Sequence, residues 1–318
     1  MPVNYLHNHK DFLALLRILE DETGIQAGLI EKDYWIMHVL YGLKTLGFDF
    51  ELKGGTSLSK GYQIIERFSE DVDIHIKPPI EFDINENPKN IKPNNIEARK
   101  KFYDWLAETI KMDGVVSVGR DHTFDDTIYY RSGGIRLYYE SKTDRIDGIK
   151  DGILLEAGFD KVTPNKKITI SSWAYERATE NSAINIIDNR AVGIACYHPG
   201  YTFVERLQTI ATKFRQEQAN REIRANFMRQ YYDIYCLLNN SDVQAFIGTS
   251  EYYAHKEARF PTIDLAIPIM NNEAFLLNEP ALRADFKKRY IATSALYYKE
   301  QPNFDDLLAL IKTHANRL

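Results

Sequence analysis

Two neighbouring stretches decide the fold of this chain: Leu52-Lys-Gly-Gly-Thr-Ser-Leu-Ser-Lys60 and Glu66-Arg-Phe-Ser-Glu-Asp-Val-Asp-Ile-His-Ile76. The first stretch begins at the end of a strand predicted over residues 48–53, where apolar and polar residues alternate. A glycine pair then forms a turn into a helix that is predicted to reach about residue 66. The second stretch alternates strictly over residues 71–76, which predicts a second strand.

This strand–turn–helix–strand order has a chemical consequence. The Gly54-Gly55 turn lets backbone N–H groups approach phosphate oxygens closely. Asp71 and Asp73 share one face of their strand, about 7 Å apart, because side chains alternate with period two. Paired carboxylates suit hard cations such as Mg²⁺ or Mn²⁺, which neutralise a triphosphate and position an in-line attack on phosphorus. Each feature alone is usually structural, but together and in this order they predict an NTP site.

The remaining periodicity predicts a mixed β-sheet flanked by helices, an α+β (α/β) fold with a helical C-terminal part. Helices are expected over residues 11–21, 27–46, 96–111, 224–238, 272–277, 280–299 and 304–314, and further strands over 127–131, 135–139, 153–159 and 167–170. After about Ala191 the chain is expected to be helical, with Thr202 and Glu205 forming a capping box. The expected domains are therefore residues 1–190 and residues 191–318.

Composition narrows the class of protein. The 318 residues carry 40 Lys and Arg against 45 Asp and Glu, a formal charge of −5. Bulk charge therefore does not favour nucleic-acid coating, although a local basic groove remains compatible with it. The two cysteines, Cys196 and Cys236, are too few for a disulfide framework or a metal cluster. A polar start and the lack of a long apolar run predict a cytoplasmic protein without a membrane partner.

The stretch Gly54-Gly-Thr-Ser-Leu58, followed by Arg67-Phe-Ser-Glu-Asp-Val-Asp-Ile74, resembles the first motif of the DNA polymerase β-like nucleotidyltransferases. It is most similar to the AbiEii/AbiGii toxins, also called the MenT-like or type IV toxin family. The resemblance extends from Glu31-Lys-Asp-Tyr-Trp35 to about Leu238. One departure is that fifteen residues separate Gly55 from Asp71, more than in the broad superfamily pattern.

The resemblance implies further site residues. A later family motif has a lysine on a helix, matched by Lys213, which suits phosphate as a compact charge. Another resembles Arg-Asp-x-x-Asp-Leu and is matched by Arg229 and Asp233, with Gln230 in place of the first aspartate. The superfamily also has a third carboxylate on a later strand. Glu156 is the candidate, since it interrupts an apolar run where a lone carboxylate is costly.

The resemblance and the motif together define the candidate residues. The catalytic candidates are Asp71, Asp73, Glu156, Lys213 and Asp233, and the metal candidates are Asp71, Asp73 and Glu156. The nucleotide-binding candidates are Gly54, Gly55, Thr56, Ser57, Lys60, Arg67 and Lys213. Structural alternatives remain open for several of them: Ser57 as a helix cap, Arg67 paired with Glu66 or Glu70, Asp233 paired on the surface with Arg229, and Glu156 on a solvated edge strand. A basic run, Lys213, Arg215, Arg221, Arg224 and Arg229, is either an RNA-facing surface or simply solvated.

The resemblance implies a Mg²⁺-dependent nucleotidyltransferase acting as the toxin of a toxin–antitoxin or phage-defence pair. Its partners are then an NTP, an RNA acceptor (the tRNA 3′ end is one candidate) and a cognate antitoxin. Two alternatives share the motif: a catalytically silent nucleotide-binding module that acts through a protein partner, and a phosphotransferase acting on proteins or small molecules. Only substitution of Asp71 and identification of the acceptor separate the three hypotheses.

Overall fold

The computed structural model describes residues 3–146, 148–180, 185–220, 223 and 227–318. The chain forms two compact units. Unit 1 comprises Met1–Gly61 and Ser69–Tyr197, and unit 2 comprises Tyr62–Phe68 and His198–Leu318. None of the helices in the described ranges combines the length and the apolar character that a membrane span requires.

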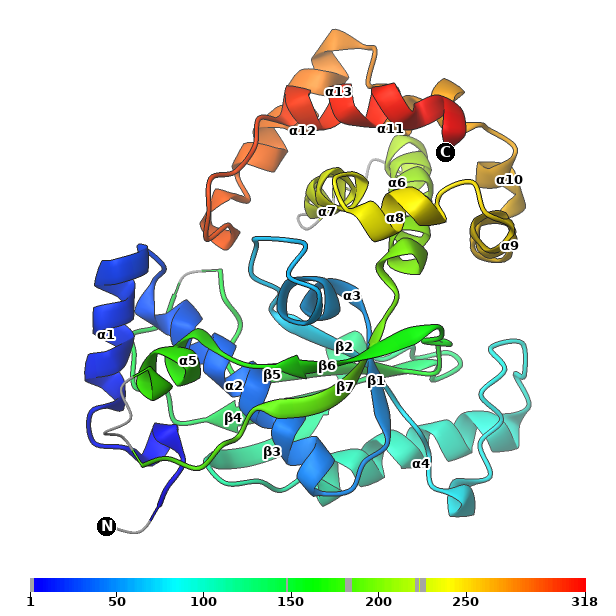
Figure 1. Ribbon diagram of the computed structural model, residues 1–318. Coiled ribbons are helices and arrows are strands. Elements are labelled where there is room, and N and C mark those ends of the chain that lie inside the picture. The colour runs from blue at the N-terminus through cyan, green and yellow to red at the C-terminus, as the bar shows by residue number, and fades with distance from the viewer. Residues whose placement is uncertain (1–2, 147, 181–184, 221–222, 224–226) are drawn as a thin grey trace. The chain divides into compact units, whose positions relative to one another are not determined.

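Unit 1 is built on a mixed sheet whose seven strands, among the described residues, have the order β3-β4-β5-β2-β1-β7-β6 (Figure 1). The strands are β1 (Phe50–Leu52), β2 (Asp71–Ile76), β3 (Val115–Asp121), β4 (Ser132–Tyr139), β5 (Ile153–Gly158), β6 (Asn165–Ile170) and β7 (Ala191–Tyr197). The pairs β1–β7 and β2–β5 are parallel, and the other neighbouring pairs are antiparallel. The predicted mixed sheet flanked by helices is confirmed.

Helices α2 and α4 pack on one face of this sheet (Figure 1). The helices of unit 1 are α1 (Phe12–Thr23), α2 (Ala27–Thr45), α3 (Gly54–Thr56), α4 (Pro93–Thr109) and α5 (Trp173–Thr179). Trp35 of α2 stacks on Tyr139 of β4, with ring centroids 4.5 Å apart. Tyr103 of α4 lies where a Cβ on Gly133 of β4 would fall, 2.7 Å away. Since Gly133 and Tyr139 are six residues apart, both helices cover the same face, and the other face is available for a site.

Unit 2 is helical. Its helices are α6 (Pro199–Asn220), α7 (Arg229–Leu238), α8 (Ser241–Phe246), α9 (Ser250–Arg259), α10 (Thr262–Leu265), α11 (Glu273–Leu276), α12 (Pro280–Ile291) and α13 (Phe304–His314). Buried aromatic rings of α7, α12 and α13 pack edge to face at its centre, among them Tyr231, Phe286 and Phe304. The segment Tyr62–Phe68 pairs with the chain after α12, where Phe68 N–H donates to the Leu296 carbonyl at 2.7 Å.

The strands predicted over residues 48–53, 71–76, 135–139, 153–159 and 167–170 are present, most with shifted ends, whereas the strand predicted over 127–131 is wrong. The structure begins and ends β2 at the predicted residues, Asp71 and Ile76. Residues 127–131 are not a strand: the Asp126 carboxylate accepts N–H groups of this segment, and Tyr130 has φ +48°. The chain after Ala191 is first β7 and only then helical, so the expected boundary at residue 190 falls before a strand of the sheet. Strand β3 was missed, since its residues do not alternate.

One helix end and one helix start also differ from expectation. The helix after the glycine turn ends as a π-helical turn at Gly61, so it does not reach residue 66. Helix α6 begins at Pro199, which places Thr202 inside it with its side chain buried. The expected capping box is therefore wrong, and the ring of His198 takes its place by accepting the Gly200 N–H at 3.1 Å.

Candidate active site

The glycine turn lies directly against the second aspartate. Gly54 has φ +68°, and a Cβ added to it would stand 1.8 Å from Oδ2 of Asp73, so only glycine fits. The backbone continues this contact, because Lys53 N–H donates to the Asp73 carbonyl at 3.0 Å. The Thr56 hydroxyl donates to the Asp71 carbonyl at 2.8 Å. The turn and the start of β2 therefore form one rigid piece.

Three carboxylates share the face of the sheet opposite α2 and α4. Along β2, Asp71 and Asp73 are half-exposed, whereas Val72, Ile74 and Ile76 are buried. Asp73 is the register partner of Glu156 on β5, so the two side chains are neighbours on the same face. On the other side of Glu156 the register partner is Gly134, which has no side chain. Because β5 lies between β4 and β2, Glu156 is not on an edge strand.

The three carboxylates lie close enough for their negative charges to raise the pKa of Glu156. Burial raises the pKa of Glu156, and the charges of Asp73 and Asp71 raise it further, to about 7. Lys150 and Lys53 act in the opposite direction. Oxygen ligands of this kind are the donors that Mg²⁺ and Mn²⁺ take, and concentrated negative charge fits a divalent cation. As placed, no three carboxylate, imidazole or thiol groups of the described residues converge on one metal position.

Two lysines that the sequence did not single out flank the carboxylates. The ammonium of Lys150 lies 3.5 Å from Oδ1 of Asp71 and 4.5 Å from the centroid of the Phe124 ring. Lys53, the residue before the glycine turn, pairs with Asp160 at 2.6 Å. Lys53 stood inside the motif, so its position was a usable signal, whereas Lys150 lies in a polar loop with no pattern to mark it.

The other turn residues have internal partners. The ammonium of Lys60 is 2.7 Å from the carboxylate of Asp33, which is buried, and 5.0 Å from the centroid of the Trp173 ring. Ser57 is fully buried beside the thiol of Cys196; burial raises the pKa of that thiol to about 11, and the Ser57 side chain opposes the shift. These contacts shape the turn from inside the fold.

In unit 2 the structure brings Arg67 and Asp233 together. The guanidinium donates from Nε and Nη2 to the two carboxylate oxygens, at 2.7 and 2.8 Å, and both side chains are buried. Burial acts to lower the pKa of Arg67, but the charge of Asp233 offsets this and the pKa is raised. Arg206 of α6 is a second cation, 3.1 Å from Asp233. The structure thus favours neither of the structural alternatives that the sequence left open, Arg67 paired with Glu66 or Glu70 and Asp233 paired with Arg229 on the surface.

Lys213 lies on α6 with a half-buried side chain. In the expected basic run, Arg215 pairs with Asp264 at 2.6 Å, while Arg221 and Arg224 lie outside the described residues.

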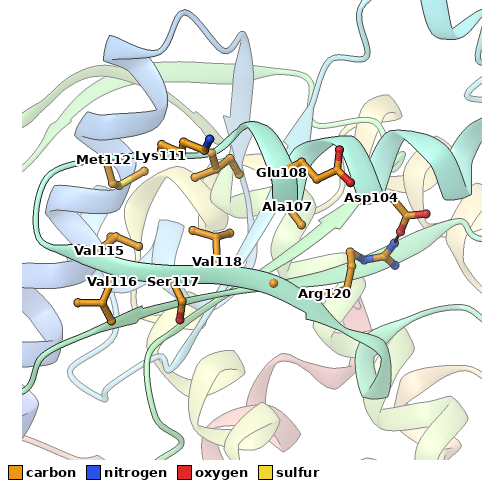
Figure 2. A pocket seen from close by; sticks show the side chains of 12 residues that line it. Asp104, Ala107, Glu108, Lys111, Met112, Val115, Val116, Ser117, Val118 and Arg120 are labelled. Carbon is orange, nitrogen blue, oxygen red and sulfur yellow. Dashed lines mark hydrogen bonds and ion pairs between the residues drawn. The ribbon is translucent and has the colours of Figure 1, made fainter.

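Described residues of unit 1 line two hollows of different character. One, of about 730 Å³, lies between the end of α4 and the edge strand β3, where Val115, Val118 and Met112 face it and Arg120 pairs with Asp104 (Figure 2). It lies three strands from β2 in the sheet order. The other, of about 310 Å³, is lined by the loop that joins β4 to β5. Lys150 of this loop and Lys32 of α2 are among its lining residues. Since Lys150 reaches Asp71, this second hollow adjoins the carboxylates.

A glycine turn held against paired strand aspartates, with a third carboxylate on the adjacent strand, defines a nucleotidyltransferase-like protein. The family model described as nucleotidyl transferase AbiEii toxin, type IV toxin–antitoxin system, matches residues 38–310. The chain belongs to this family, and the predicted family is confirmed. Members generally use a divalent metal and an NTP, and a toxin of this type implies an antitoxin partner.

Other comparisons add less. No curated protein matches the chain. A solved structure that does match is the crystal structure of an antigenic nucleotidyltransferase-like protein from Paracoccidioides brasiliensis. It is 15% identical, covers 85% of this chain and 98% of its own, and has a TM-score of 0.36.

Proposed function

We propose that this protein is a Mg²⁺-dependent nucleotidyltransferase that transfers a nucleoside monophosphate from an NTP to a hydroxyl of RNA, as the toxin of a toxin–antitoxin pair. The observation that carries the proposal is the contact between Gly54 and the carboxylate of Asp73. A turn suited to phosphate and a carboxylate suited to a cation lie in direct contact, as a nucleoside triphosphate with its metal requires.

The proposed reaction forms one bond and breaks one. The acceptor hydroxyl oxygen bonds to the α-phosphorus of the NTP, while the bond from that phosphorus to the bridging oxygen breaks and pyrophosphate leaves. The hydroxyl proton passes to a site carboxylate, for which Glu156 is the candidate, and then to water. Asp71 and Asp73, with Glu156, would hold the divalent cation. When bound, such a cation neutralises the phosphate oxygens and orients them.

The remaining candidates divide by what they contact. Gly54 and Gly55 offer backbone N–H groups to the phosphates, and Lys213 supplies a cation to the triphosphate. Thr56, Ser57 and Lys60 hold the turn in shape through their internal partners. Arg67 and Asp233 are buried against each other, so in this proposal they hold the helical unit together and do not touch the substrate.

The test is incubation of the purified full chain with each α-³²P-labelled NTP, Mg²⁺ or Mn²⁺ and total RNA. Asp71→Asn and Asp73→Asn remove one charge each at nearly constant volume and should abolish labelling. Asp49→Asn is the matched control, because Asp49 is an exposed carboxylate 3.8 Å from Lys77 and away from the turn. Label in RNA with wild type and Asp49→Asn alone supports the proposal and names the base.

Other outcomes redirect it. Label on protein or on a small molecule moves the acceptor away from RNA and favours the phosphotransferase hypothesis. If wild type transfers no label but binds an NTP, and Asp71→Asn stays toxic when expressed, the protein is a binding module. Repeating the assay after removal of metal with a chelator should abolish transfer, and activity that survives chelation contradicts the metal dependence.

A further inference from the structure

Buried charged side chains hold the loop between β4 and β5, residues 141–152. The structure describes all of this loop except residue 147. Its anchors are four charged side chains, each less than a tenth exposed: Glu31, Lys32, Glu70 and Arg136. Burying charge costs stability unless each charge is fully hydrogen-bonded, and here the bonds go to the loop.

The first anchor holds the beginning of the loop. The carboxylate of Glu31 accepts four hydrogen bonds, from the Ser141 hydroxyl at 2.8 Å, the Lys142 N–H at 2.8 Å, and the N–H and hydroxyl of Thr143 at 3.2 and 2.7 Å. Gly28, one helical turn earlier in α2, lets the loop approach closely, since a Cβ there would be 2.8 Å from Ile146. The loop therefore has a fixed start.

The other anchors hold its end around one residue, Lys150. Glu70 accepts the Lys150 N–H at 3.1 Å, and the ammonium of Lys32 donates to the Lys150 carbonyl. Arg136 donates to the Asp151 carbonyl at 2.9 Å. With its backbone clamped on both sides, Lys150 is a preorganised cation at the edge of the carboxylate cluster, 3.5 Å from Asp71.

The loop encloses the hollow of about 310 Å³, which lies at the lower end of the volumes typical of small-ligand pockets, roughly 300–1,000 Å³. Lys32 and Lys150 line it together with Arg145 and Tyr138. The two lining carboxylates, Asp144 and Asp151, have arginine partners, Arg17 at 3.5 Å and Arg145 at 2.6 Å. Cations beside an exposed aromatic ring are the combination that binds the backbone and bases of single-stranded nucleic acid.

The order of the strands indicates whether this hollow lies on the side of the NTP or on the side of the acceptor. β2 lies between β1 and β5. The glycine turn follows β1, and the loop leads into β5, where Leu154 is the register partner of Asp71. The turn and the loop thus flank the aspartates from opposite sides at the same end of the sheet. In an in-line displacement the attacking hydroxyl enters opposite the leaving pyrophosphate.

We propose that the hollow under the β4–β5 loop is the acceptor subsite, and that it binds the 3′ end of a single-stranded RNA through Lys150, Arg145 and Tyr138. The assignment rests on the proposed function, because it takes the glycine turn as the side that holds the triphosphate. Lys32, Glu31, Glu70 and Arg136 are positioning residues that fix the loop. The exposed Arg145–Asp151 pair is weak enough to open for a phosphate group.

The test measures RNA binding without chemistry. A short 5′-fluorescein-labelled single-stranded RNA with a free 3′-hydroxyl is titrated with the full chain, and anisotropy is followed from low to high salt without NTP. Lys150→Gln and Arg145→Gln should each weaken binding about tenfold at low salt, since a hydrogen bond to a charged group is lost. Each should also flatten the plot of log K against log salt by about 0.7. Lys166→Gln, which removes an exposed cation on β6, should change neither.

Affinity for a fluorescent NTP with Mg²⁺, measured on the same variants, decides between substrates. RNA affinity that falls while NTP affinity stays within twofold supports the acceptor subsite. NTP affinity that falls as much as RNA affinity overturns it and assigns the hollow to the incoming nucleotide. Unchanged RNA affinity in both variants also overturns it. If wild type transfers label and the variants do so equally well, the subsite is wrong and the proposed function stands. If wild type transfers no label but the variants lose RNA affinity, the hollow binds RNA and the proposed function is wrong.

Discussion

In unit 2 the carboxylate of Asp233 is buried against two arginines, whereas in unit 1 the half-buried carboxylate of Glu156 lies beside two aspartates. The first arrangement compensates charge, and its geometry is bidentate. The second concentrates charge of one sign and raises the pKa of Glu156 to about 7. The compensated pair stabilises the fold. The like-charge cluster costs stability, so its presence indicates a catalytic or cation-binding site.

The largest expected effect comes from breaking the compensated pair. Asp233→Asn leaves the Arg67 guanidinium buried next to a neutral amide, and removing one partner of a buried pair costs about 3–5 kcal/mol of unfolding free energy. The change should appear in far-UV circular dichroism during urea unfolding, because unit 2 is helical. Tryptophan fluorescence should move less, since Trp35, Trp105 and Trp173 all lie in unit 1. A loss below about 1 kcal/mol would contradict the structural role.

The like-charge cluster should respond in the opposite direction. Since the pKa of Glu156 is raised on folding, the folded state holds its proton more tightly, and stability falls as pH rises from about 4.5 to about 7. Glu156→Gln removes this loss and should stabilise unit 1 at pH 8 by up to about 3 kcal/mol, with little effect at pH 4.5.

The measurement for Glu156→Gln is urea unfolding followed by tryptophan fluorescence, in chelator so that no cation compensates the carboxylates. The same variant should lose nucleotide transfer. Glu51→Gln provides the comparison, because Glu51 lies on β1 opposite His75 and is not among the groups that shift the pKa of Glu156. A variant that is less stable than wild type at pH 8 would show that Glu156 is compensated after all.

The sequence predicted the strand that carries the motif better than the long-range contacts around it, because the motif is local. Strict alternation over Asp71–Ile76 reports a strand with one buried face, and the structure agrees residue by residue. The pairing of Arg67 with Asp233 spans 166 positions, and periodicity carries no information about such partners. The same holds for Lys150, whose role depends on Lys32 and Glu70 far along the chain.

The long spacing between the glycine turn and Asp71 also finds its explanation only in three dimensions. The sequence showed that fifteen residues separate Gly55 from Asp71, more than the broad superfamily pattern. In the structure, part of this interval, Tyr62–Phe68, belongs to unit 2 and not to unit 1. Glu66 N–H donates to the Tyr232 hydroxyl at 3.0 Å there, so the segment is part of the helical packing. The long spacing therefore includes residues that fold with the helical unit.

A third buried group sharpens the comparison because burial is the largest influence on its titration. Burial lowers the pKa of His38 to about 4, with His7 adding to the effect and Asp113 opposing it. The unfolded state therefore binds a proton that the folded state does not, and stability falls as pH drops from about 6.5 towards 4. At pH 5 the loss is about 2 kcal/mol relative to pH 7.

His38→Gln should reduce this pH dependence. The imidazole bonds the Asp113 carbonyl at 2.9 Å and the Asn189 amide at 2.9 Å, and a glutamine amide keeps a donor without a titrating group. Tryptophan-detected unfolding at pH 7 and pH 5 measures the difference between the two proteins. His9→Gln, at a histidine that pairs loosely with Asp11 at 3.8 Å near the surface, serves as control. An unchanged slope in His38→Gln would assign the acid sensitivity to other groups.

The smallest effect is expected at Asp305, a carboxylate on the surface of unit 2 that has two cationic partners, as Asp233 does. Asp305 pairs with Arg283 and Lys287, each at 2.7 Å, but its side chain is 38% exposed where that of Asp233 is 0% exposed. Water already solvates these charges and salt screens them, so Asp305→Asn should cost less than about 1 kcal/mol, and less still at high salt. Urea unfolding followed by circular dichroism measures the loss of unfolding free energy in Asp305→Asn and in Asp233→Asn. Because each carboxylate has two cationic partners, the difference between the two losses reports the effect of burial. Equal losses at the two positions would mean that pairing, and not burial, sets the strength of these contacts.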